Sequence, residues 1–157
     1  MKVFLQSIKL YTLLLATLFL GGCSQEDDIE EIFCSGRWSL VNFFETKNWE
    51  STNSHGDTPL ITKPETSSKN WISITFNDDG SVKGVLTDGE FTARWQGDAS
   101  TRTISITQVK TTVSPNGTSK EFIERLKQVK YYKGDSRTLQ LAPESRTSYI
   151  QLMHNND

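Results

Sequence analysis

The chain has 157 residues, of which 17 are basic and 19 are acidic, for a formal net charge of −2. This length fits one domain with a short extension. It carries no basic stripe, which argues against nucleic acid as a partner. No motif for binding a nucleotide, a phosphate or a metal is present, so we predict no cofactor and no metal site.

Residues 1–22 have the three parts of an export signal. Lys2 and Lys9 supply a positive start, and the run from Leu10 to Leu20 is nearly all apolar. A transmembrane helix needs about 20 apolar residues. This run is much shorter, so we predict a signal peptide that is removed. Its removal takes away two lysines and leaves 15 basic and 19 acidic residues.

The four residues Leu20-Gly21-Gly22-Cys23 resemble the lipobox of bacterial lipoproteins. This resemblance implies cleavage before Cys23 and attachment of acyl chains such as palmitate to Cys23, which anchors the protein in the membrane. Each buried CH₂ contributes about 0.8 kcal/mol, so several chains anchor a protein stably. The alternative is an ordinary signal peptide followed by a chance cysteine. Ser24 replaces the Asp that retains enterobacterial lipoproteins at the inner membrane, which favours the outer membrane.

Residues 23–35 are predicted to form an acidic tether. Their acidic cluster resembles the surface-export signal of lipoproteins in the Bacteroides group, and a solvated charged tether is the alternative explanation. The domain is therefore predicted on either the cell surface or the periplasmic face. With Cys23 lipidated, Cys34 has no partner for an intramolecular disulfide. We interpret Cys34 as a small buried residue rather than a catalytic thiol.

The predicted domain spans residues 36–157 and begins with a strand that places Trp38, Leu40 and Phe44 on one face. Residues 46–70 then form a polar loop of unusual length. Leu60 and Ile61 are expected to attach the middle of this loop to the domain. Trp49 lies in the loop and has no assigned place in a core.

From residue 71 to residue 109, alternating apolar residues predict four antiparallel strands joined by tight turns. Asp88-Gly89 is a hairpin signal. Asn77-Asp78-Asp79-Gly80 predicts a turn, and a calcium loop is the weaker alternative because its glycine is misplaced. A helix is predicted at about 119–130, followed by three short strands. The fold class is mainly β (α+β): a curved antiparallel sheet or partial barrel of about eight strands packed on one helix.

Several segments resemble the META domain family of bacterial lipoproteins in their order and pattern: Trp38 and Leu40, Ile74–Phe76, Glu121–Leu126, Val129–Tyr132, Leu139–Leu141 and Ile150–Leu152. The resemblance implies a curved antiparallel sheet on one helix and no established reaction. Many META domains have Gly-Cys-Asn after the central strand, whereas Gly84 here precedes Val85 and Leu86. That departure leaves lipocalin-like small lipoproteins as a rival family.

These features predict a non-catalytic envelope lipoprotein, not an enzyme, that binds a small ligand, a glycan or another envelope protein and has a possible role in envelope stress. Trp49, Trp71 and Tyr149 are the candidate ligand-binding residues. Trp71 is out of phase with the strand that follows it, so we expect it to face outward, where tryptophan can anchor an interface or cover an open sheet face.

Two alternatives remain. The protein could be an inhibitor or assembly partner that acts through loop 46–70, because rigid β scaffolds often present functional loops. In that case, deletion of residues 50–66 should barely change the melting temperature. A hydrolase is the less favoured alternative. It needs a nucleophile with a base, or two carboxylates across a cleft, whereas the acidic residues here lie mostly in the tether and in turns.

Overall fold

The computed structural model describes residues 25–51, 56–62 and 71–154. The predicted signal peptide (1–22) and the lipidation site Cys23 lie outside the described residues. The elements follow in this order: α2 (Gln25–Phe33), β1 (Arg37–Glu45), β2 (Thr58–Pro59), β3 (Ser73–Phe76), β4 (Ser81–Leu86), β5 (Gly89–Asp98), β6 (Thr103–Thr111), α3 (Gly117–Leu126), β7 (Val129–Gly134), β8 (Thr138–Pro143) and β9 (Ser148–His154).

The strands form one nine-stranded antiparallel sheet in the order β2-β1-β3-β4-β5-β6-β7-β8-β9. Strand β1 also pairs with β9, so the sheet is partly ring-like without being a barrel. The β6–β7 contact is short, because Thr103 and Tyr131 are its one paired position. The predicted curved antiparallel sheet is confirmed, with nine strands in place of about eight. Neither described helix is long and apolar enough to cross a membrane.

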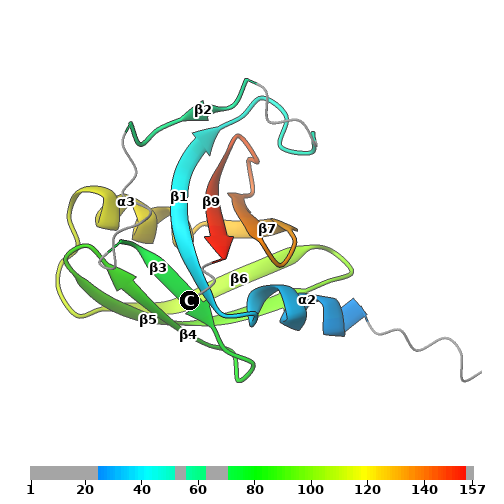
Figure 1. The fold of residues 1–157 in the computed structure, drawn as a ribbon, viewed down its shortest axis with the longest axis horizontal. Helices are drawn as coiled ribbons and strands as arrows, with labels where there is room; N and C mark the ends of the chain where they lie inside the picture. The colour runs from blue at the N-terminus through cyan, green and yellow to red at the C-terminus, as the bar shows by residue number, and fades with distance from the viewer. Residues whose placement is uncertain (1–24, 52–55, 63–70, 155–157) are drawn as a thin grey trace, which may run out of the picture.

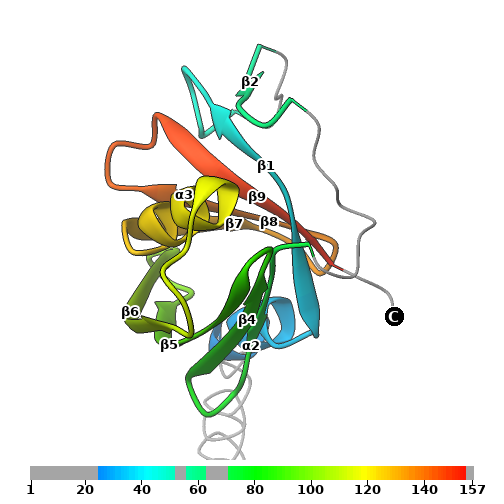
Figure 2. The ribbon, with the colours of Figure 1, turned by 90° about the vertical axis from the view of Figure 1, so that its left-hand side faces the viewer.

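The two helices lie at opposite ends of the curved sheet (Figures 1 and 2). Helix α3 confirms the predicted helix, although it ends at Leu126. It buries Phe122, Ile123 and Leu126 against the sheet. Its N-terminal end is tied to the turn between β4 and β5, where the Thr87 amide donates to Ser119 Oγ at 3.2 Å.

Helix α2 corrects the prediction that residues 23–35 are a tether. Ile29 and Phe33 belong to the main core. The Phe33 ring contacts the rings of Phe76, Trp95 and Tyr132 at centroid distances of 4.9, 5.2 and 5.0 Å. Ile29 and Phe33 are spaced by one helical turn, and the acidic residues between them hid this amphipathic period.

Strand β1 contains a register shift between Leu40 and Asn42. Trp38 and Leu40 are fully buried, as predicted. The shift reverses the alternation beyond it, so Phe43 enters the core. Phe44, which was predicted to share the inner face, instead stacks on Tyr149 at 5.2 Å.

Trp71 is buried in the main core with 6% of its surface exposed. The expectation that it faces outward is therefore wrong. Its Nε1 donates to the Leu40 carbonyl at 2.5 Å. Trp71 precedes β3, which begins at Ser73, so the two-residue period of a strand does not apply to it.

The predicted turn at Asn77–Gly80 is confirmed. The Gly80 amide donates to the Asn77 carbonyl at 3.0 Å, and the Ser81 amide donates to Asp79 Oδ1 at 2.8 Å. Gly80 has a φ of +75°, a conformation that glycine adopts without steric cost. This short turn delivers the chain into β4.

Candidate functional site

A second apolar cluster lies on the outer face of the sheet. Trp49, Ala142 and Tyr149 are buried together, with Phe44 and Tyr131 packed against them. In β8 and β9 the neighbouring residues Leu141 and Ile150 belong to the main core. Because side chains alternate between the faces of a sheet, Ala142 and Tyr149 point away from that core. The segment after β1 therefore folds back over the outside of the sheet.

This arrangement brings together two of the three predicted ligand-binding residues. Trp49 and Tyr149 share the outer cluster, whereas Trp71 lies in the main core. Asp57, which follows β1 in the chain as Trp49 does, accepts a hydrogen bond from the Tyr149 hydroxyl at 2.9 Å. Burial raises the pKa of Tyr149, and the Asp57 carboxylate raises it further. The tyrosine therefore stays a protonated donor at neutral pH.

A cavity of about 850 Å³ lies beside the outer cluster. We call it the loop cavity. Its wall is formed by residues 49–51, Asp57, the β5–β6 turn, strands β7 and β8 with the turn between them, and the β8–β9 turn. The residues that line it are Trp49, Glu50, Ser51, Asp57, Thr101, Arg102, Tyr131, Lys133, Gly134, Asp135, Thr138, Gln140 and Arg146.

Arg146 and Lys133 flank the aromatic residues of the loop cavity. The Arg146 guanidinium lies 3.9 Å from the centre of the Tyr131 ring and 5.8 Å from that of Trp49, and it pairs with Glu50. The Lys133 ammonium lies 5.1 Å from the Trp49 ring. Cation–π contacts of this kind hold aromatic and basic side chains together.

Lys133 also connects residues 49–51 to β7 by hydrogen bonds. Its Nζ donates to the Trp49 carbonyl and, at 3.1 Å, to the Ser51 carbonyl. Burial lowers the pKa of Lys133, and the nearby carboxylates of Glu50 and Asp57 partly oppose that change. An ammonium group has three donors, so within the described residues one remains for another acceptor.

Asp135 sits in the turn between β7 and β8. Its Oδ1 accepts hydrogen bonds from the amides of Arg137 at 2.7 Å and Thr138 at 2.9 Å. These amides hold the pKa of Asp135 below its usual value. A carboxylate offers about four lone-pair positions, so Asp135 retains acceptor capacity at the edge of the cavity.

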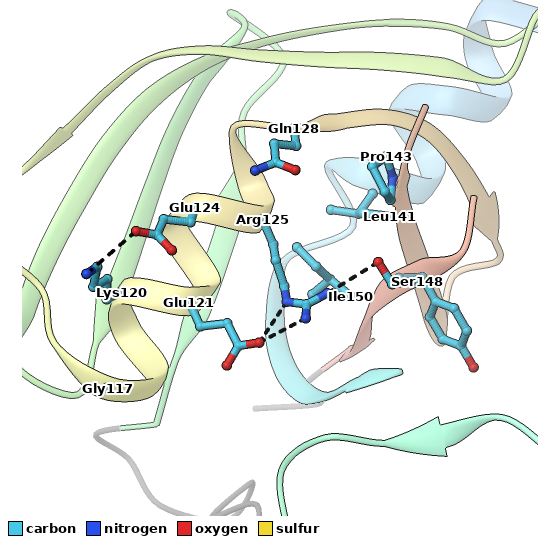
Figure 3. A pocket seen from close by; sticks show the side chains of 11 residues that line it. Gly117, Lys120, Glu121, Glu124, Arg125, Gln128, Leu141, Pro143, Ser148 and Ile150 are labelled. Carbon is cyan, nitrogen blue, oxygen red and sulfur yellow. Dashed lines mark hydrogen bonds and ion pairs between the residues drawn. The ribbon is translucent and has the colours of Figure 1, made fainter. Parts of the chain in front are cut away.

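A second cavity, of about 510 Å³, lies between α3 and strands β8 and β9. We call it the helix cleft (Figure 3). Arg125 points between Glu121 and Ser148, with its Nη2 2.9 Å from Glu121 Oε1 and its Nη1 3.3 Å from Ser148 Oγ. Glu121 and Arg125 are four residues apart on α3, the spacing at which oppositely charged side chains pair on a helix. We favour the loop cavity as the functional site because it is larger, at about 850 Å³ against about 510 Å³, and because Trp49 and Tyr131 line it together with six charged side chains.

Cys34 does not have the surroundings of a reactive thiol. It is half-buried, and burial followed by the charges of Glu30 and Asp78 raises its pKa. A nucleophilic cysteine needs the opposite shift, toward the thiolate. Cys34 was interpreted as a small buried residue, whereas the structure leaves it partly exposed.

Sequence reasoning found Trp49 and Tyr149 but missed Tyr131, Lys133 and Arg146. Tyr131 and Lys133 alternate on β7, which indicates a shared outer face. That signal was available in the sequence. The contribution of Arg146 was not, because it depends on the β8–β9 turn folding beside a tryptophan almost 100 residues earlier.

The comparisons with known proteins concern the whole domain. The family model described as Domain of unknown function (DUF4847) matches residues 24–154. A crystal structure of a DUF4847 family protein from Bacteroides vulgatus ATCC 8482 is 33% identical, with a TM-score of 0.67, and the similarity covers 82% of this chain and 99% of that chain. A search of curated proteins found no match.

An NMR structure of a protein from Burkholderia xenovorans has a TM-score of 0.56 at 12% identity, covering 81% of this chain and 86% of that one. At this identity the likeness concerns the fold alone. The family match corrects the resemblance to META domains, which rested on a pattern of apolar and turn residues that other antiparallel sheets share. The chain belongs to the DUF4847 family.

Proposed function

We propose that this protein is a lipid-anchored, non-catalytic binding module of the bacterial envelope, and that its loop cavity holds a small polar ligand. The convergence of charged and aromatic side chains from five separate parts of the chain carries this proposal. Cavities with a few well-placed polar groups are the usual sites for small ligands.

The anchor is supported by the sequence Leu20-Gly21-Gly22-Cys23. Helix α2 begins at Gln25, two residues after Cys23. A lipid on Cys23 would therefore hold the folded domain close to the membrane without an extended tether. The similar structure from Bacteroides vulgatus comes from the group whose surface-export signal the acidic cluster resembles. We propose the outer membrane as the location, with the domain on the cell surface or on the periplasmic face.

The non-catalytic role is supported by how the carboxylates of the cavity are used. Glu50 pairs with Arg146, Asp57 accepts from Tyr149, and Asp135 accepts from backbone amides. A hydrolase needs a carboxylate poised with a raised pKa or placed to deprotonate a nucleophile. The pKa of Asp135 is instead lowered.

The contacts made by the described part of loop 46–70 support a role as a wall of the loop cavity rather than as a free recognition loop. Strand β2 pairs with β1, the Leu60 amide donates to the Phe43 carbonyl, and Trp49 is buried. The expectation that Leu60 and Ile61 attach the loop to the domain agrees with these contacts. An inhibitor or assembly role through this loop is therefore the weaker proposal.

Two experiments test the proposed function. Protease treatment of intact host cells, with mass spectrometry of the lipidated N-terminus, tests the anchor and its side of the membrane. Cys23→Ala should release the protein into the soluble fraction. Wild-type protein that is soluble and unacylated would contradict the anchor.

The cavity is tested by thermal-shift screening of the mature chain, as Cys23→Ser, against polar metabolites and oligosaccharides. Hits should bind Arg146→Ala more weakly and the exposed β6 variant Lys110→Ala equally well. Hits that bind both variants like the parent chain would place binding outside the loop cavity.

A further inference from the structure

The indole nitrogen of Trp49 differs from those of the other three tryptophans. Trp38 donates to the Phe33 carbonyl at 3.0 Å, Trp71 to that of Leu40 and Trp95 to that of Asn77 at 2.8 Å. Trp49 is only 6% exposed, yet its Nε1 has no acceptor within residues 25–51, 56–62 and 71–154. A buried donor without an acceptor is destabilising and rare in native proteins.

An unused acceptor lies in the wall of the same cavity. Gln140 donates through Nε2 to Gln151 Oε1 at 2.8 Å, but its Oε1 is buried and has no donor in the part of the chain that the structure describes. Both residues line the loop cavity, so its wall contains one buried N–H donor and one buried carbonyl acceptor that are unpaired within the described residues. A hydroxyl group is both an acceptor and a donor, so it meets both requirements.

The charges in the cavity wall balance. Three carboxylates, those of Glu50, Asp57 and Asp135, stand with three cations, those of Arg102, Lys133 and Arg146. The Arg102 side chain makes no hydrogen bond or ion pair in the described residues, and Lys133 has a spare N–H. A wall that mixes both signs favours a neutral molecule with many hydroxyls over an anion or a cation, because each hydroxyl can pair with either kind of group.

From these observations we infer that the loop cavity binds a neutral saccharide whose hydroxyls accept from Trp49 Nε1 and donate to Gln140 Oε1. This inference rests on the proposed binding function and names its ligand class. Trp49 is too buried to offer a ring face, and Arg146 covers one face of Tyr131. Recognition therefore depends on hydrogen bonds to hydroxyls, and it discriminates between sugars by hydroxyl stereochemistry.

The test uses the mature chain from residue 23, with Cys23→Ser to keep it in solution. An array first presents malto-, cello-, xylo-, manno- and galacto-oligosaccharides beside polygalacturonate and heparin as acidic probes. The best neutral oligosaccharide is then titrated into ¹⁵N-labelled protein. The four indole N–H signals serve as internal reporters, and the Trp49 signal is assigned with Trp49→Phe.

We expect a neutral oligosaccharide to bind and to move the Trp49 indole signal while the other three stay in place. Trp49→Phe keeps an aromatic ring and removes the donor, so it should weaken binding about tenfold. Arg102→Ala changes an exposed side chain and should weaken binding severalfold without altering the melting temperature. Lys110→Ala should bind like the parent chain.

Two results overturn the inference. One is an array on which no neutral saccharide binds, whether or not the acidic probes do. The other is a neutral saccharide that binds while the Trp49 indole signal stays fixed. The proposed function fails separately if no compound of any class in the thermal-shift screen depends on Arg146.

Discussion

Asn42 binds both backbone groups of Ile61. Its Nδ2 donates to the Ile61 carbonyl at 2.9 Å, and its Oδ1 accepts from the Ile61 amide at 2.8 Å. The same Oδ1 accepts from the Phe43 amide at 2.8 Å. The buried Asn42 side chain, at the β1 register shift, thus holds Ile61 through both of its backbone groups, as a neighbouring strand does in a sheet.

Asn42→Ala should lower the free energy of unfolding by about 1–3 kcal/mol, because it removes hydrogen bonds from the buried Phe43 amide and from the partly buried backbone of Ile61. Urea unfolding of the mature chain measures the change. Asn48→Ala, at an exposed position of the same loop, is the matched control and should differ little from the parent chain. Equal stabilities for the two variants would show that the Asn42 contacts do not hold the loop.

Deletion of residues 50–66 should lower the melting temperature by about 5 °C or more, because a loss of 1–2 kcal/mol has that effect in a domain of this size. The deletion removes Asp57, the partner of Tyr149, and Ile61, the partner of Asn42. Differential scanning calorimetry gives the measurement. An unchanged melting temperature would restore the alternative in which the loop acts as a free recognition element.

Gly84→Ala should destabilise the domain by about 1–3 kcal/mol or more through overpacking. A Cβ at this position would lie 2.0 Å from Cε1 of Phe91 and 2.7 Å from the Ser73 carbonyl oxygen. The neighbouring exposed position gives the control, Lys83→Ala, which should stay within about 0.5 kcal/mol of the parent chain. Chemical denaturation that finds both variants alike would contradict the close approach of Phe91 to β4.

Phe33→Ala should cost about 3–5 kcal/mol, as expected for removal of a fully buried aromatic ring. The ring is 0% exposed and touches three other aromatic side chains. Glu31→Ala, on the exposed side of α2, should leave stability nearly unchanged. If both variants unfold at the same denaturant concentration as the parent, α2 is a tether after all.

Asp135 should contribute to the acid sensitivity of the domain. Its pKa is lowered from 3.8 by hydrogen bonds from the amides of Thr138 and Arg137. A carboxylate with a lowered folded-state pKa stabilises the fold fully above its unfolded-state pKa, and this contribution is lost as the pH falls through the folded-state value.

Asp135→Asn keeps an acceptor oxygen but does not titrate. Its stability relative to the parent chain should therefore rise as the pH falls from about 5 to about 2.5. Urea midpoints measured at several pH values give the comparison. A difference between the two chains that is constant over this range would contradict the lowered pKa.

The sequence predicted the secondary structure correctly where the spacing of apolar residues stays regular along an element. Alternation in β3, β5 and β9 and the apolar face of α3 predicted the sheet and its helix. Prediction failed where the period breaks. The register shift in β1 turns Phe43 into the core, where Phe44 was predicted. Trp71 lies before the first residue of β3 and is buried, where an outward position was predicted. In α2, the acidic residues concealed the apolar spacing of Ile29 and Phe33.

The candidate site was harder to predict than the fold. Trp49 was identifiable because an aromatic residue in a polar loop lacks an obvious partner. The residues that surround it come from β7, β8 and the β8–β9 turn, and their proximity follows only from the ring-like curvature of the sheet. No local pattern encodes that proximity.

The pairing of β1 with β9 also bears on how the protein is made. Phe44 of β1 pairs with Tyr149 of β9, so β1 cannot complete its pairing until a strand about 100 residues later in the chain is present. Closing so long a loop is entropically costly and slow. The ring-like sheet therefore cannot close until synthesis of the chain is nearly complete, so this closure is a late, post-translational step of folding.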